Sequence, residues 1–289
     1  MKHNIISISI ISFFFAIFFF SSSGFNNLDD YEEKLVKKKL NSFDESLKNE
    51  SIDKIIGVVG KSLIGTEYVA GTLDENINSE KLVIKISGLD CVTFVENTLA
   101  MARTIQTGQP SLESFKDELQ SIRYRDGKID GYTSRLHYFS DWIYDNEKKG
   151  VVQDITKKIG GVMYNKKINF MSTHRSSYKQ LESDDDALSQ IKKIENKINN
   201  RDMYYIPKSS VDKYYDDLQT GDIIATTTEI KGLDVTHTGF IYKKKGKTYF
   251  LHASLSAKEV IVSKEELKSY LKSDKKKTGI MVARPYGVN

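Results

Sequence analysis

The stretch Leu89-Asp90-Cys91-Val92-Thr93-Phe94-Val95-Glu96-Asn97 decides the predicted fold, and it holds the single cysteine of the 289-residue chain. Ser87-Gly88 precedes it, and apolar residues then recur three or four positions apart, as on one face of a helix. The pattern predicts a helix from Cys91 to about Thr107, with Asp90 as its N-cap. The free N–H groups and the dipole at a helix start favour a thiolate, which makes Cys91 a candidate nucleophile. The alternative is a small buried cysteine that packs as a hydrophobic side chain.

The N-terminal residues predict the cellular compartment of the protein. Met1-Lys2-His3 is basic, residues 5–20 are almost wholly apolar, and Ser21-Ser22-Ser23-Gly24 supplies small residues for cleavage. This order is typical of a secretory signal peptide, residues 1–24, and predicts a secreted or periplasmic protein. An uncleaved anchor is the alternative, since a membrane span needs about 17–25 residues. No cysteine lies near the end of this segment, so the signal carries no cysteine for lipid attachment.

The presence of a single cysteine limits the roles that its thiol can have. A secreted chain with one cysteine cannot form an internal disulfide, and an idle free thiol is a liability in an oxidising compartment. A reactive role for Cys91 is therefore favoured. The net charge of +4 comes from mixed basic and acidic runs, and the runs 243–245 and 275–277 are expected in a hairpin turn and a loop. We expect no nucleic-acid partner, and no membrane span once the signal is removed.

The pattern along the chain predicts an α+β fold. Residues 25–50 are expected to form an exposed polar lead-in helix, and residues 51–289 a single domain. The predicted helices cover residues 51–65, 112–124, 183–200 and 263–271, besides the helix of Cys91. The predicted strands at residues 221–226, 235–242, 248–253 and 260–262 form an antiparallel meander, and residues 280–283 are a closing strand. The helix of Cys91 is expected to pack on this sheet.

Two histidines on neighbouring strands supply a base for the cysteine. With a turn near Gly246, His237 and His252 nearly face each other across the hairpin and face the cysteine helix. His237 is then the candidate base, and His252 the polar group that fixes its tautomer. A zinc site built from Cys91, the two histidines and His137 or His174 is the alternative. The sequence lacks the closely spaced ligand pairs that are typical of such sites.

Two further segments are candidates for the substrate groove. Tyr68 lies in a turn between Gly65 and Gly71, about 23 residues before Cys91, where it is either an ordinary loop residue or a tyrosine held against the nucleophile. Residues 123–142 combine aromatic side chains with arginines, which suits sugars, peptides or carboxylates. The alternative for these aromatic residues is packing into the core.

Several longer strings resemble a known family. The Asp90-Cys91 helix, the His237-Thr238-Gly239 strand and the His252-Ala253-Ser254 strand resemble the NlpC-type cell-wall cysteine hydrolases, which have a papain-like core. Residues 89–97, 131–142 and 232–239 resemble one branch more closely, the N-acetylmuramoyl-L-alanine amidase-like proteins, which are associated with periplasmic cleavage of anhydro-muropeptides. The resemblance spans about residues 50–286. It implies a papain-like core with extra helical insertions.

The resemblance also implies roles for particular residues. Cys91 would be the nucleophile, His237 the base and His252 the orienting residue. The implied substrate residues are Tyr68, Ser134, Arg135, His137, Tyr138, Asp141, Asp234 and Thr236. The implied reaction is hydrolysis of the (anhydro)muramoyl–L-alanine amide of a muropeptide by a monomer, with no cofactor and no metal. The alternatives are a γ-D-glutamyl–diaminopimelate endopeptidase, an acyltransferase and a muropeptide-binding protein without turnover.

Overall fold

The structure is a computed structural model, and it describes residues 22–75 and 79–288. The predicted signal peptide, residues 1–24, therefore lies almost wholly outside the described residues. The described part of the chain begins with helix α1 (Ser22–Leu40). No helix in this part is long and apolar enough to cross a bilayer.

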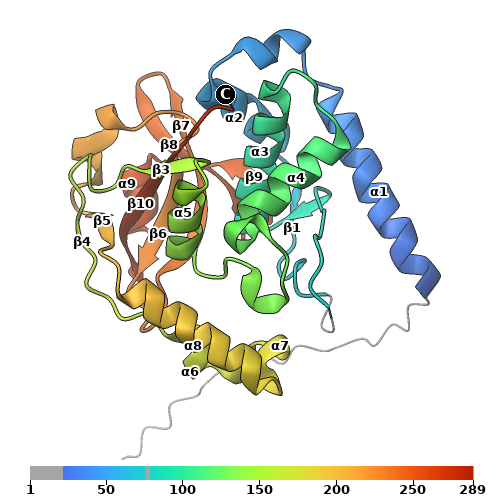
Figure 1. Cartoon of the computed structure of the whole chain (residues 1–289). Helices are drawn as coiled ribbons and strands as arrows, with labels where there is room; N and C mark the ends of the chain where they lie inside the picture. The colour runs from blue at the N-terminus through green and yellow to red at the C-terminus, as the bar shows by residue number, and fades with distance from the viewer. Residues whose placement is uncertain (1–21, 76–78, 289) are drawn as a thin grey trace, which may run out of the picture.

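The described strands form one large, mostly antiparallel sheet. Their order across it is β2-β1-β9-β8-β7-β6-β10-β5-β4, with β3 also paired to β10 (Figure 1). The strands are β1 (Glu67–Tyr68), β2 (Gly88–Leu89), β3 (Val152–Asp154), β4 (Val162–Met163), β5 (Tyr204–Pro207), β6 (Ile223–Thr228), β7 (Val235–Lys244), β8 (Lys247–Ser254), β9 (Glu259–Val262) and β10 (Lys277–Pro285). The predicted meander corresponds to β6 through β9, and its antiparallel pairing is confirmed.

The helices confirm the predicted α+β class. They are α2 (Ile52–Ser62), α3 (Cys91–Gln106), α4 (Leu112–Arg123), α5 (Phe139–Lys148), α6 (Phe170–Thr173), α7 (Lys179–Glu182), α8 (Asp185–Asn199) and α9 (Leu267–Lys272). In Figure 1, α6, α7 and α8 lie together at one end of the molecule, and α1 runs along its opposite side. The helix expected over residues 263–271 is shorter than predicted, since α9 begins at Leu267.

The sheet is buried on both faces because successive side chains along a strand point to opposite faces and large apolar side chains lie on both. Phe240 and Leu251 point into the core that α2, α3 and α4 share with the sheet. Ile241 and Phe250, one position away, point to the opposite face, which α9 covers. Each large apolar side chain buried in this way contributes about 1.5–3 kcal/mol. The edge-on contact of Phe94 with Phe240, with ring centroids 5.7 Å apart, fixes α3 against β7.

The lead-in segment is less exposed than its polar sequence predicts. Val36 and Leu40 of α1 belong to the main core, and Glu32 is only 7% exposed. The segment ends in a short 3-10 helix, Glu45–Asn49, so that residues 25–50 are not one continuous helix. The segment was predicted to be exposed because charged residues surround these few apolar positions in the sequence.

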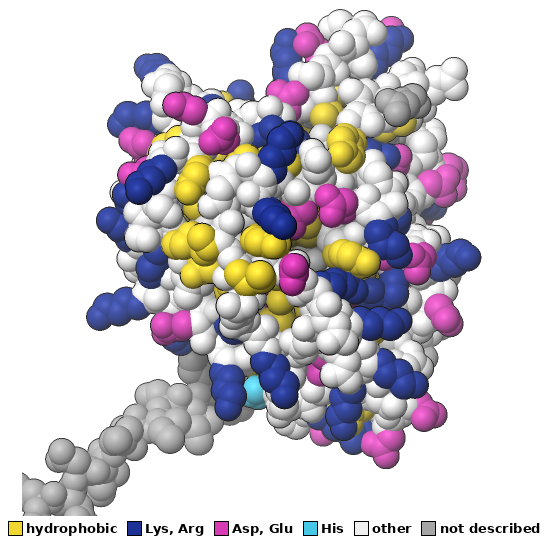
Figure 2. Space-filling view, turned by 60° about the vertical axis from the view of Figure 1, so that its left-hand side comes forward, with side chains coloured by type: hydrophobic (Ala, Val, Ile, Leu, Met, Phe, Trp, Pro, Cys, Tyr) yellow, Lys and Arg dark blue, Asp and Glu magenta, His cyan; other side chains and the backbone are white. Residues whose placement is uncertain are grey.

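The surface carries charges of both signs. On the face shown in Figure 2, lysine and arginine side chains are interspersed with aspartate and glutamate, and hydrophobic side chains gather near its middle. The predicted turn at residues 243–247 is a two-residue hairpin loop in which Lys245 and Gly246 have φ of 51° and 75°. Positive φ at both positions is the conformation that suits a tight hairpin between twisted strands.

The register of this hairpin corrects the predicted pairing. Phe240 lies opposite Leu251, so Gly239, rather than His237, falls opposite His252. The histidines are diagonal neighbours and share the face that α9 covers, whereas α3 packs on the other face. The predicted pairing of the two positions is therefore shifted, although His237 still lines the same cavity as Cys91 at the start of α3. The β7–β8 ladder ends at Phe240 and Leu251, and His237 lies beyond that end.

Gly239 is expected to be essential for this arrangement. A Cβ at position 239 would lie 2.6 Å from the Leu251 carbonyl oxygen and 2.8 Å from the His252 Cβ. Because a backbone oxygen cannot move aside cheaply, Gly239→Ala should destabilise the fold by about 1–3 kcal/mol. The measurement is a denaturant titration. Gly57→Ala is the matched control, since its nearest neighbour is a Thr220 methyl group at 3.0 Å; equal losses in both variants would contradict this account.

Candidate active site

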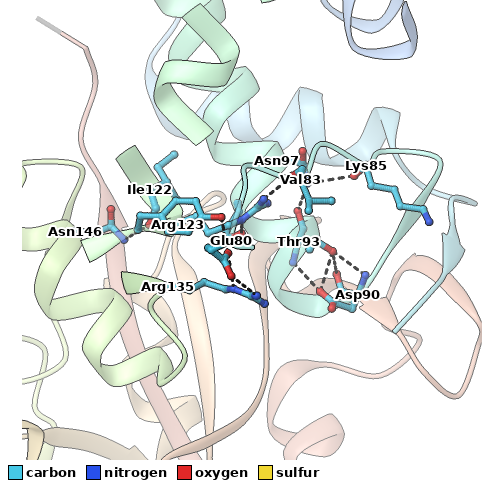
Figure 3. Close-up of polar contacts among 12 residues, drawn as sticks. Glu80, Val83, Lys85, Asp90, Thr93, Asn97, Ile122, Arg123, Arg135 and Asn146 are labelled. Carbon is cyan, nitrogen blue, oxygen red and sulfur yellow. Dashed lines mark hydrogen bonds and ion pairs between the residues drawn. The ribbon is translucent and has the colours of Figure 1, made fainter. Parts of the chain in front are cut away.

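The first turn of α3 is held by a reciprocal pair of hydrogen bonds. The Thr93 N–H donates to the Asp90 carboxylate at 2.8 Å, and the Asp90 N–H donates to the Thr93 hydroxyl at 2.9 Å (Figure 3). This capping box satisfies two backbone donors that the helix itself leaves without acceptors. The predicted N-cap is confirmed. It places Cys91 at the first position of the helix.

The Cys91 thiol is protonated in the resting site. Burial, and then the neighbouring Asp90 carboxylate, raise the pKa of the thiol to about 12. The backbone N–H groups of Thr238, Cys91 and Val92 lower the pKa of the thiol, but by less than burial and Asp90 raise it. The N–H groups at the helix start therefore favour the thiolate, as predicted, but burial and the charge of the N-cap Asp90 raise the pKa by more. The thiol needs a base to become a nucleophile.

The two predicted histidines are directly hydrogen-bonded. His237 Nε2 and His252 Nδ1 are 2.7 Å apart, and the rings meet nearly at right angles. Burial lowers the pKa of both, to about 4 for His252, so both imidazoles are neutral near pH 7. If the bond runs from His237 Nε2–H to His252, Nδ1 of His237 keeps its lone pair and can accept a proton.

Three residues that the sequence analysis did not single out surround this pair. The His252 ring stacks on Phe250, with centroids 4.5 Å apart, and meets the ring of Tyr270 edge-on at 5.1 Å. The Lys277 ammonium lies 3.7 Å from the centre of the Tyr270 ring. Its positive charge also contributes to the lowered pKa of both histidines. These contacts join α9, β8 and the start of β10, and no local sequence pattern links them.

Cys91 and His237 line one cavity of about 240 Å³. Four predicted substrate residues, Arg135, His137, Asp234 and Thr236, also line it. Its wall further includes Gly71, Leu73, Asp74, Asp90, Val92, Glu96, Leu136, Phe139, Leu233, Val235 and Thr238. Segments that are distant in the sequence, from β1–α3, from the loop before α5 and from β7, therefore meet around the thiol.

Arg135 is already paired with two carboxylates of the chain. Its guanidinium donates to both Glu80 oxygens, at 3.1 and 2.8 Å, and to Asp74 at 2.9 Å. Figure 3 shows the Arg135 and Glu80 side chains pointing toward each other. Glu80 is buried, whereas the Asp74 side chain is 54% exposed. A substrate carboxylate that binds Arg135 would have to replace Asp74.

The other lining candidates have structural partners as well. Asp234 is 1% exposed and accepts the Ser140 N–H at 2.8 Å, in the first turn of α5. His137 Nε2 lies 2.8 Å from the Tyr132 carbonyl oxygen, and burial and the Arg135 charge lower its pKa to about 3. Thr236 is exposed at the cavity. Of these three, Thr236 is therefore the most accessible to a ligand.

The remaining candidates lie outside the cavity wall. Tyr68 is paired with Leu89, two residues before Cys91, and burial and the Cys91 charge raise its pKa to about 12. The Tyr138 hydroxyl donates to Glu195 at 2.7 Å, and the Ser134 hydroxyl donates to the Gly131 carbonyl at 2.7 Å. Asp141 is fully buried between Arg125 and Arg201, at 2.6 Å from each. These contacts support the walls of the cavity.

The zinc alternative requires a cluster of ligands. Within residues 22–75 and 79–288, no group of three or more His, Cys, Asp or Glu side chains is arranged to hold a metal ion. His174 in particular is the residue that follows α6, and its ring stacks on Phe170.

The buried neutral histidines predict a loss of stability in acid. In the unfolded chain they take up protons near pH 6.5, but in the fold His252 and His137 resist protonation down to about pH 4 and 3. This contribution is present above pH 6.5 and is lost as the pH falls toward those values. The contribution is at most about 3 kcal/mol for His252 and about 5 kcal/mol for His137. Urea titrations between pH 7 and pH 4 measure the free energy of unfolding at each pH. If this free energy depended on pH in His137→Gln as steeply as in the unsubstituted protein, the account would be contradicted.

Comparison with known proteins shows the family of the chain. The sequence model of the AmiA-like family, described as N-acetylmuramoyl-L-alanine amidase-like, matches residues 58–280. No curated protein sequence matches the chain. An N-acetylmuramoyl-L-alanine amidase from Bacteroides uniformis has a similar structure, with 40% sequence identity and a TM-score of 0.77 over 81% of this chain and 98% of that one.

Two further structures are similar. A Bacteroides fragilis protein, crystallised as a candidate xylanase, is 41% identical and has a TM-score of 0.75 over 78% of this chain and 99% of that one. A Legionella pneumophila protein, 22% identical, shares the fold with a TM-score of 0.64 over 92% of this chain and 97% of that one. Because the family model covers most of the sequence, from α2 to β10, the chain belongs to the N-acetylmuramoyl-L-alanine amidase-like family.

Proposed function

We propose that the protein is a cysteine-dependent amidase that cleaves the amide between (anhydro)muramic acid and L-alanine in peptidoglycan fragments. The observation that carries this proposal is that the Cys91 thiol and His237 line a single cavity, and that His237 is hydrogen-bonded to His252. The family match and the amidase from Bacteroides uniformis support the choice of bond. We further propose that Cys91, His237 and His252 are the catalytic residues.

The proposed reaction passes through a thioester. Nδ1 of His237 takes the proton of the Cys91 thiol, and sulfur attacks the carbonyl carbon of the lactyl group. The C–N bond breaks, and the amine of L-alanine leaves with the proton from His237. Water then attacks the thioester and gives a proton to His237, the C–S bond breaks, and the thiolate recovers this proton. The products are the sugar acid and the free L-alanyl peptide.

The pKa values of the thiol and of His237 describe a site that is neutral at rest. Because burial keeps the thiol protonated and both imidazoles neutral, proton transfer would occur when the substrate arrives rather than at rest. The Cys91 N–H at the start of α3 is the proposed donor to the oxyanion. Tyr68, paired beside Leu89, is proposed to shape this side of the site.

The proposed fold family and setting follow the sequence. We propose a papain-like, NlpC-type core in which the N-terminus of α3 meets the strands of the two histidines. Residues 51–289 would form a single domain after a lead-in at residues 25–50. From the expected signal peptide we propose a periplasmic or secreted protein. We further propose that it acts as a monomer and that muropeptides are its partners.

A glycosidase, which the xylanase name of one similar structure suggests, is less well supported. Glycosidases generally use two carboxyl groups as acid and as base or nucleophile. The cavity has four carboxylates in its described wall, and each is committed to the chain. Asp90 caps α3, Asp234 binds the first turn of α5, Asp74 pairs with Arg135, and Glu96 pairs with the buried Arg123 at 2.7 Å.

Product analysis distinguishes the remaining alternatives. The mature protein is incubated with muropeptides ending in anhydro-muramic acid and with ones ending in reducing muramic acid, and the products are identified by mass. Free sugar plus an intact L-alanyl peptide is the expected result. Cleavage after D-glutamate would identify an endopeptidase, and transfer to an added amine an acyltransferase. Binding without turnover would identify a muropeptide-binding protein.

A further inference from the structure

The segment leading to Cys91 has little backbone pairing of its own. Residues 79–87 belong to no described helix or strand, although residues 82–86 are mostly apolar. Side chains of the helices bind its carbonyl groups instead: the Tyr124 hydroxyl donates to Lys81, the Arg123 guanidinium to Val83 and the Asn97 amide to Lys85. Figure 3 shows the last two of these contacts. Buried backbone groups need such partners.

The N–H groups at the end of this segment are bound by one carboxylate. Glu32 Oε2 accepts the Ile86 N–H at 2.8 Å and the Ser87 N–H at 3.2 Å, and Glu32 Oε1 accepts the Ser87 hydroxyl. Glu32 belongs to α1 and is 7% exposed. A charged acceptor makes these bonds stronger than neutral ones.

Helix α1 is itself fixed to the domain. Val36 and Leu40 are buried in the main core, and Glu33, the residue after Glu32, pairs with Lys116 of α4 at 2.8 Å. The position of Glu32 is therefore set by packing. α1 also precedes the family-matched residues, which begin at 58.

The path from Glu32 to the thiol is short and tightly packed. β2 begins directly after Ser87, and Asp90 and Cys91 follow it. β2 is paired with β1, and Gly88 lies so close to Val69 that an added Cβ would be 2.5 Å from a Val69 methyl group. A displacement of Ser87 would therefore pass along the chain to the N-cap and to Cys91.

We propose that Glu32 is a positioning residue for the nucleophile. Helix α1 would then contribute to the geometry of the active site, although it precedes the family-matched residues. The proposal rests on the proposed function for its catalytic readout. A shift of about 1 Å in a reacting group can cost roughly 100-fold in rate. Loss of the Glu32 acceptor should therefore lower kcat while KM changes little.

The test compares substitutions at two adjacent positions of α1. Glu32→Met keeps the length of the side chain and removes the acceptor, whereas Glu32→Gln keeps an oxygen for the two N–H groups and an amide that can donate to Ser87. Glu33→Met is the matched control. We expect Glu32→Met to lower kcat roughly 10- to 100-fold at unchanged KM, and Glu32→Gln and Glu33→Met to stay within about threefold of the unsubstituted protein.

A second readout does not depend on the substrate. The rate at which iodoacetamide alkylates Cys91 at pH 8.5 is measured for all variants well below their melting midpoints. Glu32→Met should alter this rate at least about threefold, and Glu32→Gln should restore it. If the unsubstituted protein cleaves no muropeptide, the proposed function fails and the alkylation rate still decides the role of Glu32. Alkylation and kcat in Glu32→Met that match Glu33→Met would overturn the proposal.

Discussion

Cys91→Ala is expected to lower amidase activity by roughly four orders of magnitude or more, because the proposed thioester cannot form without the sulfur. The fold should persist. Alanine keeps the Cβ at the start of α3, and the Asp90–Thr93 capping box does not involve the thiol. The measurements are the rate of L-alanyl peptide release and a thermal melt of the same preparation.

Cys91→Ser is the informative companion to this change. It keeps a similar shape but replaces the thiol with a hydroxyl, which is a much weaker nucleophile beside a neutral imidazole. Its activity should therefore also fall far below that of the unsubstituted protein. Activity that survives in Cys91→Ala, with the fold intact, would rule out Cys91 as the nucleophile and would return the cavity carboxylates to consideration.

The parts of this fold that are local in sequence could be predicted. The N-cap at Asp90, the helix from Cys91 and the hairpin turn at Gly246 each depend on residues a few positions apart, and the structure confirms all three. The pairing of β7 with β8 was nearly correct, but a register error of one or two positions changes which residue is opposite which. His237 and His252 still meet, because diagonal neighbours on one face are within reach of long side chains.

The parts of the site that depend on burial could not be predicted. The thiol pKa required knowing how much of Cys91 and of its surroundings is removed from water. Arg135 looked free to bind a ligand, yet its partners Glu80 and Asp74 lie more than fifty residues earlier. Glu32 and Lys277 act on the site although they lie outside the stretches of sequence that resemble the family. Their distances from Cys91 along the chain follow no helix or strand period.

His252 is expected to be nearly as important as the nucleophile. It is the hydrogen-bond partner of His237 Nε2 at 2.7 Å, and its acceptor keeps Nδ1 of His237 free to take the thiol proton. Without that partner the base can adopt the wrong tautomer or rotate out of line. His252→Ala should therefore lower kcat by roughly 100- to 10,000-fold, with a smaller change in KM.

The choice of replacement tests whether His252 orients the base or only fills space. In His252→Asn the amide oxygen can take the place of Nδ1 and accept the same hydrogen bond, so this variant should recover at least about tenfold of the activity that His252→Ala loses. His252→Leu keeps apolar contact with Phe250 and Tyr270 but has no acceptor, and it should stay as slow as His252→Ala. His174→Gln, directly after α6, is the control and should leave kcat unchanged. If His252→Leu were as active as His252→Asn, the hydrogen bond to His237 would have no catalytic role, and packing around Phe250 would account for the histidine.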